Sequence, residues 1–401
     1  MASRAHRESD ARRRGHASPG RGGTGVIRPD QIAYCTNVHA GADLAETERQ
    51  LALHATEVRR LVSPDGMLRI GLWLSAISAG ELGSRDAVRA FRDRLAVMGL
   101  EVITLNGFPF IDFHDHVIKH AVYEPHWGRP ERLAYTIRLA TILADLLPEH
   151  CREASISTVP IGWRPTFTNE GCGSSVGMAV SQLEAMAAHL RRIERERGVR
   201  IHVDLEPEPG CLLDTAQNVV DLFDQCFSGD SDLRRYLGVC HDVCHSAVMF
   251  EPQRIAIDAY VRAGIRIGKI QVSSAVEADG SRASLEALRE FDEPKYLHQT
   301  CVRLEGSGEV RFWEDLRPAL GLPPKGTFRT HFHVPIHLER VGPLRTTRDE
   351  IRACLAALPD DLAPTIEVET YAWGVLPESL RPATLAEGIA DEIRWLRGVV
   401  S

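Results

Sequence analysis

The sequence predicts a closed (β/α)8 barrel, also called a TIM barrel, with an insertion between its seventh and eighth strands. Eight short apolar runs, rich in Val, Ile and Leu, alternate with longer segments of helical periodicity. This alternation is typical of a parallel sheet, and eight repeats over about 370 residues favour a closed barrel over an open sheet. No G-x-G-x-x-G follows a run and no G-x-x-x-x-G-K-[ST] occurs, which argues against nucleotide-binding folds.

The predicted strands are short, and several of them end directly before Gly, Pro or Asn, residues that favour turns. They are Ile32–Thr36, Leu68–Leu74, Val102–Leu105, Ala154–Val159, Ile201–Leu205, Leu237–Cys240, Ile267–Val272 and Thr365–Val368.

The predicted helices carry recognisable end signals. Asp43 followed by Glu46 resembles a capping box that opens a helix over Leu44–Leu61. Gly198 suits the position after a helix over Val176–Arg197. The remaining predicted helices are one from Pro130 through Leu147, one that begins at Asp214, Pro252–Gly264, and Thr384–Val399.

The alternation breaks between Phe291 and Arg345. This segment predicts a hairpin (Tyr296–Leu304 and Val310–Phe312 around a turn over Glu305–Glu309), a short helix, and a strand over Arg329–Leu338. We place it as an insertion near the mouth of the barrel.

The ends of the chain differ in composition from its body. Residues 1–29 carry seven Arg among Ser, Gly and Ala and have no apolar core, so they predict a disordered tail and no targeting signal. Residues 30–401 predict a single barrel domain.

The overall composition is that of a globular protein. Of the 401 residues, 44% are hydrophobic and 25% are charged, and no apolar stretch is long enough to span a membrane. The net charge of −8 argues against general binding to nucleic acids. The nine cysteines have no disulfide-like spacing, which indicates reduced thiols and a cytoplasmic protein.

Acidic and amide residues occur at the ends of four predicted strands. They are Glu206 after the fifth strand, Asp242 after the sixth, Gln271 in the seventh and Glu369 after the eighth. In this fold active sites lie at the carboxyl ends of the strands, so we expect these side chains to converge. Three carboxylates that meet cannot all stay ionised unaided, so either one is protonated or a divalent cation lies among them. Oxygen ligands favour Mn, Mg or Co, and Zn is possible if His joins them.

Three histidines are candidate metal or substrate ligands. His245 follows Asp242 by three residues, and His331 and His333 share one face of the strand predicted over Arg329–Leu338. The alternative for each is a buried, hydrogen-bonded histidine of the core.

Three further polar residues are candidate substrate contacts. Arg164 can grip a carboxylate or phosphate with two parallel hydrogen bonds, and Asn106 ends the third strand. Lys269 shares the inward face of the seventh strand with Gln271. A structural ion pair of Lys269 with Glu367 or Asp204 is an equal alternative.

Several of these segments resemble motifs of a known superfamily. Leu205–Pro207, Gly238–His245 and Val368–Thr370 resemble the metal-binding strands of the xylose isomerase-like TIM-barrel superfamily, which includes sugar isomerases, epimerases and abasic-site nucleases of the endonuclease IV type. The resemblance implies a metal held by Glu206, Asp242, Gln271 and Glu369. It also matches His331 and His333 to an Asp-x-His pair of the nuclease branch.

The sequence departs from the nuclease branch at two positions. Where that branch has metal-binding histidines after strands three and four, this chain has Asn106 and Thr158. The departure favours one or two ions over a cluster of three.

A second resemblance covers nearly the whole chain from Tyr34. The matching segments are Tyr34–His39, Leu105–Pro109, Leu205–Leu213, Phe291–Thr300 and His331–Ile336, and they resemble the EboE metabolite traffic family. This resemblance implies partners from a bacterial gene cluster, including a prenyltransferase-like membrane protein. It assigns no chemical step.

Three functions therefore remain open at this point. The first is a metal-dependent isomerase or epimerase of a small hydroxy-carbonyl metabolite, in which Glu206 and Glu369 exchange the proton next to the carbonyl. The second is a metal-dependent hydrolase of a phosphate or ester. The third is a carrier that binds a small-molecule metabolite without turnover.

Overall fold

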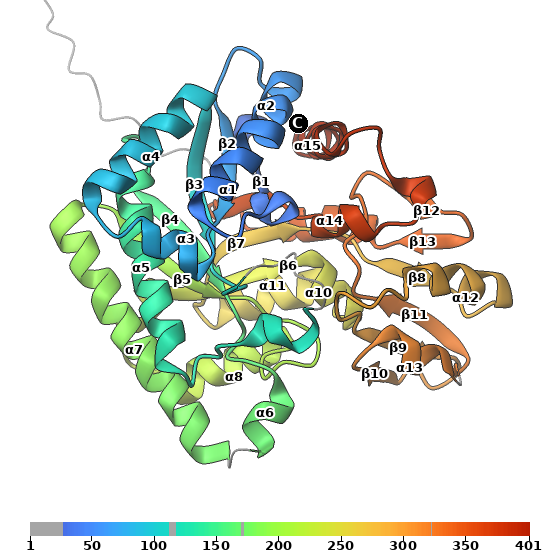
Figure 1. The fold of residues 1–401 in the computed structure, drawn as a ribbon. Coiled ribbons are helices and arrows are strands. Elements are labelled where there is room, and N and C mark those ends of the chain that lie inside the picture. Colours follow the sequence, from blue (N-terminus) through green and yellow to red (C-terminus); the bar gives the residue numbers. More distant parts are fainter. Residues whose placement is uncertain (1–26, 112–117, 170–171, 322) are drawn as a thin grey trace, which may run out of the picture.

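A computed structural model of the full chain shows a closed eight-stranded parallel barrel, which confirms the predicted fold (Figure 1). The structure describes residues 27–111, 118–169, 172–321 and 323–401, so most of the predicted tail lies outside the described residues. The barrel strands are β1 (Ala33–Cys35), β2 (Leu68–Trp73), β3 (Leu100–Asn106), β4 (Glu153–Thr158), β5 (Arg200–Leu205), β6 (Leu237–Asp242), β7 (Arg266–Val272) and β14 (Thr365–Val368).

The barrel closes through its first strand. Tyr34 of β1 is paired in parallel with Val368 of β14 on one side and with Ile70 of β2 on the other. Every barrel strand overlaps the run predicted for it, because each run is a buried, apolar segment that begins and ends at polar or turn residues.

Helices surround the barrel, and their apolar faces pack on the strands in one continuous core. They are α1 (Leu44–Gln50), α2 (Thr56–Val62), α3 (Ala76–Glu81), α4 (Arg85–Met98), α5 (Pro130–Leu146), α6 (Arg164–Asn169), α7 (Cys172–Arg197), α8 (Ala216–Cys226), α9 (Ser231–Tyr236), α10 (Val243–Val248), α11 (Gln253–Arg262), α14 (Arg348–Leu355) and α15 (Leu385–Val400). In the described part of the chain, none is both long and apolar enough to cross a membrane.

Two predicted helices differ in detail from the observed ones. The helix predicted over Leu44–Leu61 is divided by a π-helical segment over Leu51–Ala55. The helix predicted from Asp214 begins two residues later, because the Thr215 side chain accepts a hydrogen bond from the backbone of Asn218 and so caps α8.

The insertion is larger than predicted and forms a sheet of its own beside the barrel (Figure 1). It begins near Val276 rather than Phe291. Its strands run in the order β10-β9-β11-β8-β13-β12. The elements of the insertion are β8 (Val276–Ala278), α12 (Arg282–Leu288), β9 (Thr300–Leu304), β10 (Val310–Trp313), α13 (Leu316–Gly321), β11 (Gly326–Thr330), β12 (Arg340–Val341) and β13 (Leu344–Thr346).

The strand predicted over Arg329–Leu338 is wrong beyond its first two residues. β11 ends at Thr330, so His331 and His333 lie beyond its end and not within a strand. Beyond β11 the backbone N–H of Val334 donates to the carbonyl of Ser274, two residues after the end of β7. The segment is thereby drawn across the mouth of the barrel.

The interior of the barrel holds charged side chains where glycines leave room for them. A Cβ atom on Gly71 would lie 1.5 Å from Glu367 Oε1, and one on Gly268 would lie 2.2 Å from Asp204 Oδ2. Glycine at these two positions therefore lets a carboxylate pack directly against the neighbouring strand.

One buried acid on the last helix connects two loops at the barrel mouth. Glu392 of α15 accepts hydrogen bonds at Oε1 from the Thr370 hydroxyl, at 2.5 Å, and from the backbone N–H of Ile336, at 3.0 Å. Burial raises the pKa of Glu392 to about 8. Thr370 follows Glu369, and Ile336 follows His333 by three residues, so Glu392 holds both loops in place.

We predict that Glu392→Gln stabilises the protein increasingly as the pH rises. Because the pKa of Glu392 is raised in the folded state, the folded protein keeps a proton that the unfolded chain loses above pH 4–5. The free energy of unfolding therefore falls as the pH rises from there to about pH 8. Glutamine keeps both accepted hydrogen bonds without this cost. The gain in unfolding free energy should grow by roughly 2–4 kcal/mol between pH 5 and pH 8.

Urea unfolding at the two pH values measures this gain. Glu392→Leu is the control, because it removes the charge and both hydrogen bonds and should lose stability at pH 5. An equal difference between Glu392→Gln and the parent at both pH values would contradict the account.

Candidate metal and substrate site

Three carboxylates converge at the open end of the barrel. Glu206 follows β5, Asp242 ends β6 and Glu369 follows β14. One oxygen of each lies within 4.8 Å of an oxygen of the other two, and all three side chains are buried. The structure thus brings together residues that are far apart in the chain, at the spacing that a shared cation requires.

Burial and the repulsion between neighbouring carboxylates both raise the pKa of Glu206 and of Glu369. The pKa of Glu206 lies well above its usual value because the side chain is buried and because Glu369 and Asp242 are close. The pKa of Glu369 is raised well above its usual value by burial, then by Asp242 and Glu367. Positive charge placed among these carboxylates would relieve both effects.

Buried side-chain oxygens of this region include some without a hydrogen-bond partner among the described residues. Two of them are Asp242 Oδ2 and Gln271 Oε1. The orientation of Gln271 is set by its amide nitrogen, which donates to Asn106 Oδ1 at 3.1 Å. A buried oxygen without a donor costs free energy unless a cation or another ligand approaches it. These orphaned oxygens and the three carboxylates fit a divalent cation.

A buried ion pair lies among the inward-facing side chains of the barrel. Lys269 Nζ lies 2.9 Å from Glu367 Oε2, and neither side chain is exposed. Lys269 also donates to Asn106 Oδ1 at 3.0 Å. Burial by itself lowers the pKa of Lys269, but Glu367 and two nearby buried thiols together more than offset this, so the pKa lies above its usual value. Of the two alternatives for Lys269, the structure shows the ion pair with Glu367, and Lys269 does not line the pocket.

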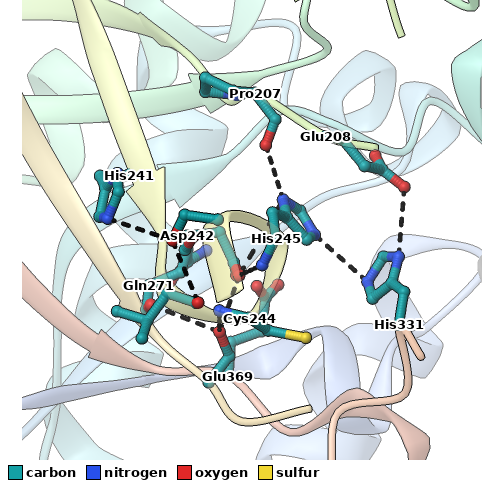
Figure 2. Close-up of polar contacts among 12 residues, drawn as sticks. Pro207, Glu208, His241, Asp242, Cys244, His245, Gln271, His331 and Glu369 are labelled. Carbon is teal, nitrogen blue, oxygen red and sulfur yellow. Dashed lines mark hydrogen bonds and ion pairs between the residues drawn. The ribbon is translucent and has the colours of Figure 1, made fainter. Parts of the chain in front are cut away.

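Three imidazoles gather beside the carboxylates. His331 Nε2 lies 3.2 Å from His245 Nε2 and 3.2 Å from His333 Nε2. Figure 2 shows His245 between the carbonyl of Pro207 and the ring of His331. His333 Nε2 also lies 4.0 Å from Asp242 Oδ2, which joins this group to the carboxylates.

The hydrogen bonds of the three rings fix which nitrogen carries the proton. His245 Nδ1 lies 2.8 Å from the backbone carbonyl oxygen of Pro207, and His333 Nδ1 lies 2.8 Å from that of Glu369. His331 Nδ1 lies 2.7 Å from the side-chain carbonyl oxygen of Gln299. A carbonyl oxygen only accepts, so Nδ1 is the protonated nitrogen and Nε2 presents its lone pair.

The charge state of the rings agrees with this assignment. Burial lowers the pKa of all three histidines, that of His333 to about 4, so the rings are neutral at physiological pH. Three unprotonated nitrogens therefore face one another and can receive a cation or hydroxyl donors.

A fourth carboxylate at the site was not identified from the sequence. Glu208 accepts hydrogen bonds at Oε1 from the Tyr123 hydroxyl, at 2.7 Å, and from Gln299 Nε2, at 2.9 Å. The same oxygen lies 3.6 Å from His331 Nδ1 (Figure 2). The two-residue spacing from Glu206 was a usable signal, because alternate residues of an extended segment share a face.

Asn37 and Cys35 were also missed. Asn37 Nδ2 donates to Glu369 Oε1 at 3.2 Å, and Cys35 Sγ lies 3.5 Å from the same oxygen. Both belong to the segment at the end of β1, where the sequence shows no charged residue to draw attention to it.

A pocket lies over these groups. Its lining includes the predicted residues Glu206, Glu369, His245, His331, His333 and Asn106. Arg164 does not line it. This arginine begins α6, is partly exposed, and binds Asp214 Oδ2 at 2.7 Å, so its guanidinium is already engaged.

Solved structures share this fold. The chain is similar to a xylose isomerase-like TIM barrel protein from Mycobacterium smegmatis in complex with magnesium, with a TM-score of 0.50, 12% identity, and 92% of this chain and 96% of that chain covered. A xylose isomerase domain protein from Planctomyces limnophilus has a TM-score of 0.49 and 14% identity, with 93% of this chain and 96% of that chain covered. An L-ribulose 3-epimerase has a TM-score of 0.46 and 14% identity, with 92% of this chain and 93% of that chain covered. The chain has the xylose isomerase-like TIM-barrel fold.

No protein-family model matches the sequence, and a search of curated proteins finds no match. The resemblance to the EboE family therefore stays a prediction.

We predict that Lys269→Met lowers the free energy of unfolding by about 3–5 kcal/mol, because it leaves the Glu367 carboxylate buried without a counter-charge. Chemical denaturation measures the loss. The double variant Lys269→Met/Glu367→Gln is the matched control and should recover most of the stability, since it removes both charges. Equal stability of the single and double variants would show that the pair carries no such coupling.

Proposed function

We propose that the protein is a divalent-metal-dependent isomerase or epimerase of a small hydroxy-carbonyl metabolite. The observation that carries the proposal is the convergence of one carboxylate oxygen each of Glu206, Asp242 and Glu369 within 4.8 Å of one another. Gln271, whose side-chain oxygen is orphaned, is the register partner of Asp242 on the neighbouring strand. Carboxylate and amide oxygens suit Mn, Mg or Co, and a contribution from the imidazoles makes Zn possible. The magnesium named for the structure from Mycobacterium smegmatis is in keeping with this choice.

The cation would be held by Glu206, Asp242, Glu369 and Gln271. When bound, such an ion polarises a carbonyl and the hydroxyl next to it and stabilises negative charge on their oxygens. Glu206 and Glu369 both line the pocket. One of them would remove the proton on the carbon next to the carbonyl, and the other would return a proton.

The neighbouring neutral residues would orient the substrate. The Nε2 atoms of His245, His331 and His333 carry lone pairs, so they would accept hydrogen bonds from substrate hydroxyls. Asn106 also lines the pocket, and its amide is fixed by Lys269 and Gln271. Polar groups that are already oriented lower the cost of placing the substrate.

We predict that Glu206→Gln and Glu369→Gln each lower turnover by about 10²–10⁴-fold while the fold is kept, because each removes a proton-transfer group and a cation ligand. Exchange of deuterium from D₂O into a panel of ketoses and aldoses, followed by NMR, measures the step directly.

Arg164→Gln is the matched control, since it removes charge outside the pocket, and it should keep full exchange. Exchange retained in both glutamate variants would refute the assigned roles.

The three imidazoles favour a second candidate, a metal-dependent phosphoester hydrolase of the endonuclease IV type. Their converging Nε2 atoms form a set of nitrogen donors next to Asp242, and two adjacent ions are typical of phosphoester hydrolysis. In the isomerase the same nitrogens contact substrate instead.

The number of bound ions separates the two candidates. For the isomerase we predict one tightly bound equivalent per chain, lost in Asp242→Asn and kept in His331→Asn, because the carboxylates hold it. Elemental analysis of the dialysed protein after loading with Mn²⁺ gives the count. Two equivalents, of which His331→Asn removes only one, would favour the hydrolase.

A third candidate is a carrier without turnover. It draws support from the sequence resemblance to EboE, which also suggests partners from the same gene cluster and a prenyltransferase-like membrane protein. The eight cysteines for which the structure gives a state are all unpaired, which supports the proposed location in the cytoplasm. Calorimetric binding of a metabolite that is recovered unchanged after hours would favour the carrier over both enzymes.

A further inference from the structure

We propose that the substrate is amphipathic: a hydroxy-carbonyl head that enters the carboxylate and imidazole cluster, joined to a flat apolar body that fills the outer half of the pocket. The inference rests on the proposed function for the head and adds the class of the body. It follows from the way in which polar and apolar side chains divide the pocket.

The inner half of the pocket is polar. Its lining consists of Asn37, Asn106, Ser157, Glu206, Glu208, His245, His331, His333 and Glu369. These residues lie at or just beyond the ends of barrel strands, or on the segment that crosses the mouth after β11. Among the described lining residues, the donors and acceptors that a head with two adjacent oxygen atoms needs are concentrated here.

Among the described residues, the outer half is mainly apolar, and it is lined by residues further along the loops after β3 and β14 and by part of the insertion. Phe108, Pro109, Ile118 and Val122 follow β3, Tyr296 and Leu297 belong to the insertion, and Tyr371 follows β14. Tyr371 packs on the cluster, with its ring centroid 4.6 Å from that of His333, and Tyr296 contacts it edge to face at 5.3 Å. The apolar wall therefore begins directly where the imidazoles end.

Two polar side chains of the outer half are already engaged. The Tyr123 hydroxyl donates to Glu208, and Lys119 Nζ is paired with Asp315 at 2.5 Å. A polyhydroxylated chain in this half would give up hydrogen bonds to water and regain few, at a cost for each hydroxyl. An aromatic or other flat apolar group would instead bury its surface against rings and aliphatic side chains.

Tyr296 and Tyr371 also line a second, open cavity. Its lining mixes apolar side chains such as Trp373 and Leu385 with charged ones such as Lys295. The apolar body is therefore assigned to the first pocket alone.

The test compares two ketones that share one head. Hydroxyacetone and 2-hydroxyacetophenone both carry a carbonyl next to a hydroxymethyl group, and they differ by a methyl in place of a phenyl ring. Calorimetry with the Mn²⁺-loaded protein gives both dissociation constants. We expect 2-hydroxyacetophenone to bind about 30-fold more tightly, as burial of the additional apolar surface of a ring implies.

Variants of the outer wall identify where the ring binds. Leu297→Asn and Val122→Asn should each reduce the preference to within about 3-fold, because a polar amide in the outer wall removes apolar surface against which the ring would be buried. Ile255→Asn is the matched control, since it replaces an exposed apolar residue of α11 outside the pocket, and it should keep the full preference. Two wall variants are used so that misfolding of one leaves the other informative.

The outcomes separate the two proposals. Equal affinities, or a preference that survives both wall variants, would overturn the amphipathic substrate and leave the proposed function standing. If neither ketone binds the loaded protein, the head has no site, and the proposed function fails together with this inference.

Discussion

The structure depends on one electrostatic constraint, the burial of like charges at the open end of a barrel. Glu206, Asp242, Glu367 and Glu369 are all buried within one region, and among the described residues Lys269, which is paired with Glu367, is the one lysine buried with them. Carboxylates that are kept from water and close to one another raise the free energy of the folded state unless protons or a cation neutralise them. Such an arrangement persists when function requires it, and a divalent cation is the neutralising group that the donor atoms fit.

The surrounding chain holds the charged groups in fixed positions. Glycines in neighbouring strands leave space for Glu367 and Asp204, so their carboxylates pack without distorting the barrel. The amide of Asn106 connects the ion pair to Gln271, and Glu392 connects the loops after Glu369 and His333 to the last helix. The backbone carbonyls of Pro207 and Glu369 orient two imidazoles. Geometry of this kind, set by neighbours that do not contact substrate, is what positions a reactive site.

Much of the fold could be predicted from the sequence because short segments of the chain carry the signals for its strands and helices. Eight buried parallel strands appear as eight apolar runs, and a closed parallel barrel places all of their carboxyl ends together, so the meeting of Glu206, Asp242 and Glu369 could be anticipated. Their role as metal ligands stays a prediction. β8, β12 and β13 were missed because segments of two or three residues show no alternation, and these strands exist only through pairing with distant partners. The involvement of Glu208 and the engagement of Arg164 by Asp214 depend on loop paths that local sequence does not specify.

The most direct test of the account is a crystal structure of the protein grown with Mn²⁺, in which anomalous scattering locates the ion. We predict an anomalous peak among Glu206, Asp242 and Glu369, with one oxygen of each carboxylate within about 2.5 Å of it, as oxygen ligation requires. A structure in which these three side chains point apart, or in which Mn²⁺ binds elsewhere and leaves the carboxylates without it, would contradict the central claim.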